Sequence, residues 1–402
     1  MRISLAGGGT DVPPLAPGIG GRVVCAAIDL HVRATVEPFD RGWVRLEGSW
    51  GLAETEAEAA TDPDSPAFAD SADSLDHAPT PVSERISVLP VVPVAGVRPG
   101  SPPRAATLTR RAGELPSTDP AFRMLEAVRQ SFGIEGGVRI AIESDLTFGT
   151  GLGGSAAAAV ALVAAFHGAI GEPASTHHLA TAANYLERDI LGLRCGMQDP
   201  LCASAGGFLD LRFFDAPNLP DNGPSTATLP FAPTATLADA TAISVPGPVG
   251  FELDTITLSP PLARELSAGL LLVDTRVRRV SGEVLDIAND GRARPFSADL
   301  VAAADDTARG FRLGSLPLVL AGMRRSASAK LRRGGAGSLP RDWVQLLIDR
   351  GAVVVRACGA GRGGHVLVWA DPSCHPDIER AVAPALVRRP SLGVPGVELL
   401  TA

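Results

Sequence analysis

Four glycines fall within the six positions from Gly149 to Gly154, and Ser155 and an alanine-rich run follow them at once. Glycine lets a backbone turn its N–H groups toward a ligand without a side chain in the way. The first N–H groups of a helix add partial positive charge at the same place. Because residues 137–144 alternate apolar and polar residues, the order is strand, glycine loop, helix. This order predicts a cradle for a phosphate group.

The same order occurs in other nucleotide-binding folds, and individual residues separate them. A P-loop requires a Lys-Ser or Lys-Thr pair after its last glycine, whereas Gly154 is followed by a serine and an alanine. A dinucleotide-binding fingerprint is formally present in Gly149, Gly151 and Gly154, but it requires a second strand that ends in an acid. The sequence offers Glu172 in a Gly-Glu-Pro loop instead. A loop that only lets a helix pack closely on a sheet stays open at this point.

The composition indicates a globular protein. The 402 residues are enough for two hydrophobic cores, and 45% of them are hydrophobic. A net charge of −8 without clustered basic residues argues against nucleic-acid binding. The cysteines lack the spacing of a zinc site or a disulfide framework. No N-terminal segment resembles a signal peptide, and the longest apolar run, 156–166, is too short to span a bilayer. We therefore expect a cytoplasmic protein without a membrane partner.

Two stretches interrupt the pattern of predicted strands and helices. Residues 49–80 contain eight acidic residues and no lysine or arginine, which predicts an acidic disordered insertion that extends to about residue 116. Residues 216–261 are rich in Pro, Ala and Thr and predict a linker at a domain boundary. Elsewhere the patterns predict strands or helices at 2–5, 22–26, 31–37, 120–132, 176–188, 208–214, 269–274, 297–310, 316–332 and 341–350.

Three glycine motifs follow one another in a fixed order along the chain. They are Arg-Ile-Ser-Leu-Ala-Gly-Gly-Gly-Thr-Asp at 2–11, Gly-Thr-Gly-Leu-Gly-Gly-Ser-Ala at 149–156 and Gly-Ala-Gly-Arg-Gly-Gly at 359–364. Together with Cys-Gly-Met-Gln-Asp at 195–199, they resemble the signature of the GHMP small-molecule kinases. The resemblance is closest to the sugar kinases of the heptose 7-phosphate kinase and fucokinase type, and it covers the chain apart from the two interruptions.

The resemblance implies an α+β chain with two domains. The N-terminal, ribosomal-protein-S5-like domain would bind ATP and span 1–215, with the insertion at 49–116. The linker 216–261 would lead to a ferredoxin-like C-terminal domain at 262–402, and the two domains would meet at the active cleft. ATP and Mg²⁺ are the implied cofactors, and a sugar or sugar phosphate is the implied small-molecule partner. A homodimer stays open.

The resemblance also implies the roles of residues around the second motif. The glycine loop would wrap the ATP phosphates, and the Ser155 hydroxyl and Glu187 carboxylate would hold Mg²⁺, which prefers oxygen ligands. Asp199 matches the catalytic base, which takes the proton of the substrate hydroxyl, and Arg2 matches an arginine near that base. The implied ATP-binding residues are Gly149, Thr150, Gly151, Leu152, Gly153, Gly154, Ser155 and Ala156.

The residues implied in substrate binding lie in the first and third motifs and beside the base. They are Gly9, Thr10, Asp11, Gln198 and Gly361. Without the resemblance, Asp11 would be interpreted as a turn residue and Glu187 as a solvated helix acid. Asp199, which precedes a proline, would be interpreted as a turn or N-cap residue.

The chain departs from the family pattern at several positions. Met197 replaces a lysine that is usual in heptose-phosphate kinases. Relatives usually carry several residues before the matching arginine, so we expect an upstream start or a shortened first strand. The single lysine among 36 basic residues makes arginine the expected cation for a phosphate. The extra arginines Arg276, Arg279 and Arg362 lead to the hypothesis that they bind a second phosphate on the substrate.

Two other functions stay open from the sequence. One is the phosphorylation of another small alcohol, such as a mevalonate-like acid or an amino alcohol, although the Gly-Gly-Gly-Thr-Asp loop favours a sugar. The other is a catalytically silent relative that binds nucleotide or another protein. The joint presence of Ser155, Glu187 and Asp199 argues against this second alternative.

Overall fold

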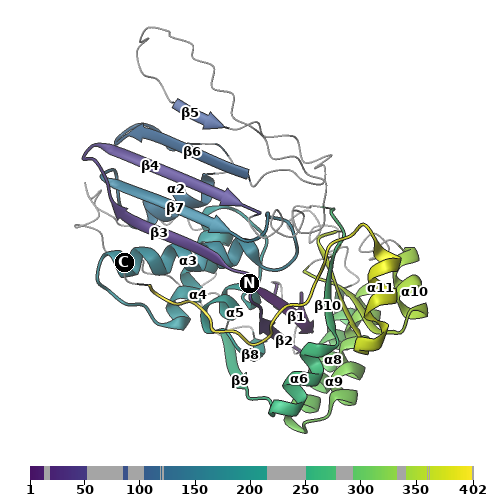
Figure 1. Cartoon of the computed structure of the whole chain (residues 1–402). Coiled ribbons are helices and arrows are strands. Elements are labelled where there is room, and N and C mark those ends of the chain that lie inside the picture. The colour runs from purple at the N-terminus through teal and green to yellow at the C-terminus, as the bar shows by residue number, and fades with distance from the viewer. Residues whose placement is uncertain are drawn as a thin grey trace.

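The computed structural model contains three sheets with helices packed between and around them (Figure 1). This arrangement confirms the predicted α+β class. The structure describes residues 1–12, 19–51, 85–88, 104–117, 119, 122–214, 250–277, 293–332, 341–359, 361 and 363–400.

A four-stranded antiparallel sheet in the order β1-β2-β8-β9 carries the first glycine motif. Its strands are β1 (Arg2–Ala6), β2 (Gly21–Ala27), β8 (Phe208–Phe214) and β9 (Gly250–Ile256). Because alternate residues of a strand face opposite sides, Cys25 of β2 packs in the cluster around Leu201, whereas its neighbour Val24 packs in the core shared with the C-terminal helices. Both faces of this sheet are therefore covered.

A five-stranded sheet in the order β3-β7-β4-β6-β5 forms the second layer of the N-terminal part. Its strands are β3 (Val32–Pro38), β4 (Trp43–Trp50), β5 (Arg85–Val88), β6 (Arg104–Arg111) and β7 (Val138–Ser144). Neighbours pair antiparallel except β4 and β7, which are parallel. One face packs on helices around Phe132, Leu162 and Phe166, which are fully buried.

Five helical segments connect this sheet to the candidate site. They are α2 (Arg123–Ser131), α3 (Gly154–Ala169), α4 (Thr176–Tyr185), the π-helical turn η1 (Leu186–Ile190) and α5 (Gln198–Ala205). The alanine-rich α3 is buried along nearly its whole length, because it packs against β3, α4 and α5 at once. Small side chains permit these close approaches, so the glycine loop at its N-terminus is held on a fixed helix.

The C-terminal part is a four-stranded sheet in the order β11-β12-β10-β13 with helices on both faces. Its elements are α6 (Pro260–Ala268), β10 (Leu270–Asp274), α8 (Ala293–Arg312), α9 (Leu316–Arg332), α10 (Arg341–Asp349), β11 (Ala352–Ala357), β12 (His365–Ala370), η4 (Pro372–Cys374), α11 (His375–Val382) and β13 (Val387–Arg388). Helices α8 and α9 form a hairpin that also packs on β1 and β2.

One hydrophobic core joins the two parts of the chain. Ile3 and Leu5 of β1 lie in the same buried cluster as Leu272 of β10, Val319 of α9 and Leu367 of β12. All five side chains are fully shielded from solvent. The burial of this shared apolar surface stabilises the arrangement of the first glycine motif against the C-terminal sheet.

Three predicted boundaries need correction. Residues 104–111 were expected in a disordered insertion, but they form β6, which pairs with β4 along its whole length. The linker predicted at 216–261 contains β9, which extends the N-terminal sheet beside β8. The C-terminal segment crosses back to the N-terminal part, where the amide of Gly207 donates to the carbonyl of Val394 (Figure 1). Residues 52–84 and 89–103 lie outside the described part of the chain.

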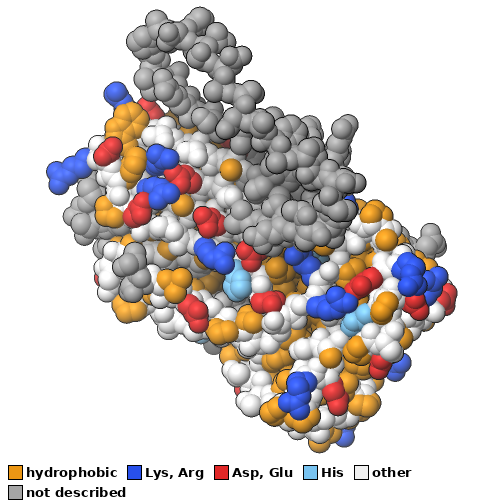
Figure 2. Space-filling model, in the orientation of Figure 1, with side chains coloured by type: hydrophobic (Ala, Val, Ile, Leu, Met, Phe, Trp, Pro, Cys, Tyr) orange, Lys and Arg blue, Asp and Glu red, His pale blue; other side chains and the backbone are white. Residues whose placement is uncertain are grey.

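The charge on the surface is mixed. On the face shown in Figure 2, basic and acidic side chains alternate over the coloured part of the molecule and do not gather by sign. Many of the described basic residues have an acidic partner on a neighbouring element, as in the pairs of Arg139 with Glu37 and Glu47. Within the described residues, we find no helix with the length and apolar character that a membrane crossing requires.

Candidate active site

The structure joins Arg2 and Asp199, which are 197 positions apart in the sequence. Nε and Nη2 of Arg2 each donate to one carboxylate oxygen of Asp199 at 2.6 Å, which is the forked geometry of an arginine–carboxylate pair. Arg2 is almost completely buried, whereas the Asp199 side chain keeps 27% of its surface exposed. Arg2 thus fixes the orientation of the Asp199 carboxylate, and the exposed part of this carboxylate is accessible to a ligand.

The glycine loop lies directly beside this pair. Nη1 of Arg2 donates to the carbonyl of Gly151 at 3.0 Å, and the Arg2 amide donates to the carbonyl of Leu152 at 3.0 Å. Gly153 has a left-handed backbone with φ of 73°, and a Cβ there would lie 3.4 Å from Asp199 Oδ2 and 3.2 Å from Cγ of Arg2. Only glycine lets the loop pass this close to the pair without strain.

Helix α3 begins at Gly154 without a side-chain cap and without an acidic residue in its first turn. The first N–H groups of a helix have no acceptor within the helix, and they carry the positive end of its dipole. The preceding Gly149, Gly151 and Gly153 all have positive φ, which turns the loop around this end. The loop and helix therefore present the anion-binding geometry that the sequence predicts.

Glu187 lies beside Ser155 at the start of α3. It belongs to the π-helical turn η1, a feature that is frequent at functional sites, and only 3% of it is exposed. Burial raises the pKa of Glu187 to about 7, a hydrogen bond from Ser155 opposes this effect, and the charge of Asp199 adds to it. Glu187 is therefore a buried acid for which no cationic partner is found among the described residues.

Asp11 connects the first glycine motif to the helix that carries the base. Its Oδ2 accepts a hydrogen bond from the amide of Gln198 at 3.0 Å, and its Oδ1 accepts one from the amide of Gly9 at 3.3 Å. Burial raises the pKa of Asp11 to about 6, although the Gln198 hydrogen bond lowers it. The side-chain carbonyl oxygen of Gln198 is buried and has no hydrogen-bond partner among the described residues, so it is available to a ligand.

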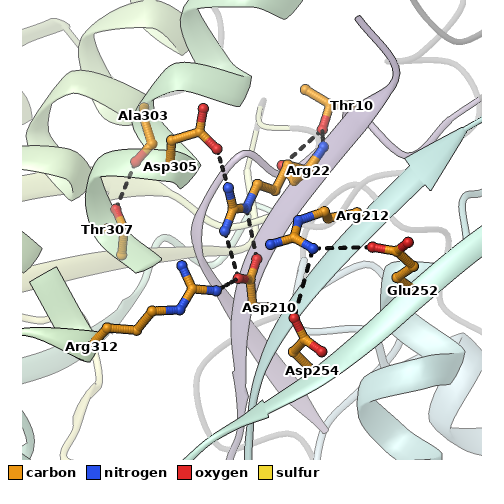
Figure 3. Close-up of polar contacts among 10 residues, drawn as sticks. All are labelled: Thr10, Arg22, Asp210, Arg212, Glu252, Asp254, Ala303, Asp305, Thr307 and Arg312. Atoms are coloured by element: carbon orange, nitrogen blue, oxygen red, sulfur yellow. Dashed lines mark hydrogen bonds and ion pairs between the residues drawn. The ribbon is translucent and has the colours of Figure 1, made fainter. Parts of the chain in front are cut away.

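Thr10 is held by the backbone of β2 rather than by the site. Its hydroxyl donates to the carbonyl of Arg22 and accepts from the Arg22 amide, both at 3.0 Å. The Arg22 side chain in turn forms a forked pair with Asp210 of β8, which Arg312 of α8 also contacts at 2.5 Å (Figure 3). A second carboxylate, that of Asp305 on α8, binds Arg22 Nη1.

The third glycine motif meets the second one. The amide of His365 and its Nδ1 both contact the carbonyl of Thr150, at 2.9 Å and 3.2 Å. A Cβ on Gly364 would lie only 2.3 Å from the same oxygen, so this position requires glycine. Gly361 also has a positive φ, of 95°. All three glycine motifs thus converge around the Arg2–Asp199 pair.

The comparisons with known proteins agree with this convergence. Residues 120–207, which include the glycine loop, Glu187 and Asp199, match the family model of the GHMP kinases N terminal domain. The match assigns a GHMP kinase N-terminal domain to this part of the chain. The chain is 24% identical over 237 residues to D-glycero-alpha-D-manno-heptose 7-phosphate kinase from Campylobacter jejuni, an alignment that covers 57% of this chain and 60% of that relative.

Two solved structures extend the likeness over the whole chain. A D-glycero-D-manno-heptose 1-phosphate kinase from Bacteroides thetaiotaomicron superposes with a TM-score of 0.60 at 16% identity, covering 100% of this chain and 98% of that chain. Phosphomevalonate kinase from Streptococcus pneumoniae superposes with a TM-score of 0.62 at 13% identity, covering 96% and 97%. Both confirm the GHMP kinase fold, and their different names mean that this fold alone does not indicate the substrate.

The residues of this candidate site fit Mg²⁺ and a nucleotide. The described residues contain no group of three or more His, Cys, Asp or Glu side chains that could hold a metal ion. Mg²⁺ usually takes one or two protein oxygens and completes its coordination with phosphates and water. Ser155 and Glu187 offer such a pair, since a buried carboxylate with a raised pKa lacks a compensating cation.

The hypothesis of a second phosphate site at the extra arginines finds no support at Arg276. This residue is exposed, and its Nη2 donates to the carbonyl of Pro384. Arg279 and Arg362 lie outside the described residues. A different arginine, Arg356 of β11, lies in the interior and contacts Ser4 of the first motif. The sequence signal for it was a single charge inside the apolar run Ala-Val-Val-Val-Arg-Ala.

Two other neighbours of the site were not predicted from the sequence. His365 contacts the glycine loop at Thr150, and Nδ2 of Asn184 on α4 donates to the carbonyl of Gly196 at 3.2 Å. Asn184 thus holds the turn that precedes Gln198 and Asp199. A polar residue inside the otherwise apolar face of α4 was the available signal.

Proposed function

We propose that this protein transfers the terminal phosphoryl group of ATP to a hydroxyl group of a sugar or sugar phosphate. The observation that carries the proposal is the hydrogen-bonded connection from Asp199 through Arg2 to the glycine loop. Phosphoryl transfer requires little covalent chemistry from the protein, and it depends mainly on positioning and on neutralisation of charge. The site supplies both within one short chain of contacts.

Asp199 is the group that receives the proton. Its carboxylate is the partly exposed member of the ion pair, so one oxygen can accept a further hydrogen bond from a substrate hydroxyl while Arg2 still donates to both oxygens. As the oxygen of the substrate attacks the terminal phosphorus, its proton passes to Asp199, and the bond from phosphorus to the ADP oxygen breaks. Arg2 fixes the carboxylate in position relative to Gly151 throughout this step.

The backbone of residues 149–156 and the N-terminus of α3 bind the phosphates. The positive φ values of three glycines and the lack of an acidic residue in the first turn of α3 favour an anion here. Ser155 and Glu187 would hold Mg²⁺, which when bound neutralises charge on the phosphates. A bound cation would also offset the cost of the buried Glu187 carboxylate.

The first glycine loop and Gln198 form the side of the site proposed for the sugar. Asp11 is held by two backbone amides, and the Gln198 carbonyl oxygen has no protein partner among the described residues. An unpaired buried acceptor is costly unless a ligand donates to it, and sugars are rich in hydroxyl donors. The name of the Campylobacter jejuni relative, a heptose 7-phosphate kinase, supports the same substrate class.

The proposal is tested by the variant Asp199→Asn, assayed with ATP, Mg²⁺ and a panel of free sugars and sugar phosphates. Formation of phosphorylated product should fall by about 10²–10⁴-fold in kcat, because the proton acceptor is removed. The affinity for magnesium nucleotide, measured by calorimetry, should change much less, since the loop and α3 are untouched.

The matched control is Asp306→Asn. Asp306 is half-exposed on α8 and pairs only with Arg325 among the described residues. The turnover of the Asp306→Asn variant should therefore equal that of the parent. Melting curves of both variants would exclude unfolding as the cause of a loss. Undiminished product formation by Asp199→Asn would remove the base assignment, and a parent protein without magnesium-nucleotide affinity would remove the proposed function.

A further inference from the structure

The segment 391–397, which we call the C-terminal strap, crosses from the C-terminal sheet to the helices of the candidate site (Figure 1). It follows β13, which pairs with β10 in the C-terminal sheet. The amide of Ser391 donates to the side chain of Asp29 at 2.9 Å, and the amide of Gly393 donates to the carbonyl of Ala27 at 2.8 Å. Backbone hydrogen bonds therefore fix the strap to the end of β2.

The strap then contacts the C-terminal end of α5, the helix that carries Asp199 in its first turn. The amide of Val397 donates to the carbonyl of Ser204 at 3.2 Å. The last carbonyls of a helix have no partner within the helix, so this bond satisfies one of them. A Cβ on Gly206 would lie only 2.1 Å from the amide nitrogen of Gly396, so the strap approaches the helix end more closely than a side chain would allow.

The side chain of Val397 packs where three helices of the site meet. It lies against the buried cluster of Ala159, Val160 and Ala183. The first two of these residues belong to α3 and the third to α4, and Ala203 of α5 packs against the same cluster. The three helices contact one another in pairs, and small side chains permit this close approach. Val397 thus adds a branched side chain from outside the helices to a junction that is lined mainly by alanine.

Each helix at this junction leads to one of the groups proposed for the chemistry. Ser155 lies in the first turn of α3, Glu187 lies in the turn η1 that follows α4, and Asp199 lies in the first turn of α5. The spacing of these groups therefore depends on how the three helices pack on one another. A misplacement of about 1 Å, even one that starts far from the reacting atoms, can lower a rate by about 10²-fold.

We propose that the C-terminal strap is a positioning element for phosphoryl transfer and that it acts through Val397. This inference rests on the proposed function. Val397 contacts the end of α5 and the alanine cluster, so its role is to hold α3, α4 and α5 at the spacing that the reaction requires. The glycine loop leads directly into α3, so nucleotide binding depends mainly on one element, whereas turnover depends on all three helices.

The experiment compares Val397→Ala and Val397→Ile with the parent in the full chain, assayed with ATP, Mg²⁺ and the panel of free sugars and sugar phosphates. The alanine variant retains the amide that donates to Ser204 but lacks the branched side chain. Its kcat should fall by about 10- to 100-fold, whereas the KM values for ATP and for the acceptor should stay within about threefold of the parent. Isoleucine retains the β-branched side chain, so the kcat of Val397→Ile should stay within about twofold of the parent.

A second variant and a control come from the neighbouring positions. A Cβ on Gly396 would lie 2.2 Å from the carbonyl oxygen of Ser204, so Gly396→Ala should displace the strap and lower kcat in the same way as Val397→Ala. Leu400 is also apolar and lies three residues beyond Val397, but 87% of it is exposed. Leu400→Ala should therefore behave as the parent.

Two measurements separate positioning from a general loss of stability. Each kcat is divided by the concentration of nucleotide-binding sites, which calorimetric titration with magnesium nucleotide provides, so unfolded protein is not counted. Hydrogen exchange of the α5 amides measures the effect of the strap on this helix. It should be about 10-fold faster in Val397→Ala than in the parent or in Leu400→Ala. Exchange in β11, at the far edge of the C-terminal sheet, should not change.

Three results would overturn the inference. They are an unchanged kcat in Val397→Ala, an equal loss of kcat in Val397→Ala and Leu400→Ala, and a change confined to the KM for ATP. Failure of the proposed function looks different, because the parent itself would then form no phosphorylated product. In that case the exchange data decide: faster exchange of the α5 amides in Val397→Ala alone would support the strap as a positioning element of the helices, and equal exchange in both variants would exclude it.

Discussion

Two buried charged contacts join the N-terminal sheet to the C-terminal part of the chain, and they are built differently. At the first, Asp210 has no exposed side-chain surface and accepts hydrogen bonds from Arg22 and Arg312 (Figure 3). At the second, Arg356 contacts Ser4 only through a carbonyl and a hydroxyl. The first contact pairs opposite charges, whereas the second leaves a positive charge without a carboxylate among the described residues.

The difference between the two contacts lies in how the buried charge is compensated. A buried carboxylate with two arginines is already satisfied, and no further partner is needed. The buried guanidinium of Arg356, in contrast, keeps an Nε donor without a hydrogen-bond partner among the described residues. The two contacts can therefore be separated by substitution, since removal of Asp210 deprives two arginines of their buried partner, whereas removal of Arg356 removes a charge without a carboxylate partner among the described residues.

The largest effect is expected for Asp210→Asn. This change leaves the guanidinium of Arg22 without its buried partner, and the loss of one member of a buried pair costs about 3–5 kcal/mol. The free energy of unfolding, measured by urea denaturation, should fall by that order. The backbone of Arg22 also holds Thr10, so the KM for the acceptor should rise as well.

Asp305→Asn is the internal control for that prediction. Asp305 contacts the same guanidinium, but 52% of its side chain is exposed. Exposed ion pairs are worth about 0–1 kcal/mol, so this variant should be nearly as stable as the parent. Equal losses in the two variants would mean that burial does not distinguish the contacts, and the comparison would fail at its first step.

The sequence predicted the elements better than it predicted these contacts. The strand at 208–214 and the helix that follows the glycine loop were correctly predicted, because local sequence patterns decide both. The strand β6 was missed, because its formation depends on pairing with β4, more than fifty residues away in the sequence. The prediction instead extended the disorder of the acidic stretch 49–80 to about residue 116.

The candidate site shows the same limit. The motifs predict a common site for Asp199 and Ser155, and only the resemblance to the GHMP kinases adds Glu187 to it. The partner of Arg356 could not be predicted, because the contact joins Ser4 and Arg356 across 352 positions. No local pattern encodes such a distance, although a charge inside an apolar strand indicates that something unusual must surround it.

An intermediate effect is expected for Asp11, whose charge is compensated in part. Two backbone amides contact its carboxylate, but no cation does so among the described residues, and burial raises its pKa to about 6. The folded state therefore binds a proton more tightly than the unfolded chain, in which the pKa is about 4. The stability contributed by this group is present at low pH and is lost as the pH rises from about 4 to about 6.

The test is the pH dependence of unfolding in the parent and in Asp11→Asn. The asparagine has no charge to titrate and retains an oxygen for one of the two amides, so the fall of roughly 1–3 kcal/mol between those pH values should be absent. The slope of the parent in that window should therefore be steeper than that of the variant. Equal slopes of unfolding free energy against pH in the parent and the variant would show that the charge of Asp11 is fully compensated, as that of Asp210 is.

The smallest effect on stability is expected for Arg356→Met. Methionine fills a similar volume in a cluster that contains Val354 and Cys358, and it removes a charge that no carboxylate compensates among the described residues. The carbonyl and hydroxyl of Ser4 lose a donor, which costs about 1–3 kcal/mol and offsets the gain. The net change in unfolding free energy, measured by urea denaturation, should stay within about 1 kcal/mol. A loss of unfolding free energy as large as that of Asp210→Asn would instead show that the Arg356–Ser4 contact stabilises the fold as strongly as the contact at Asp210.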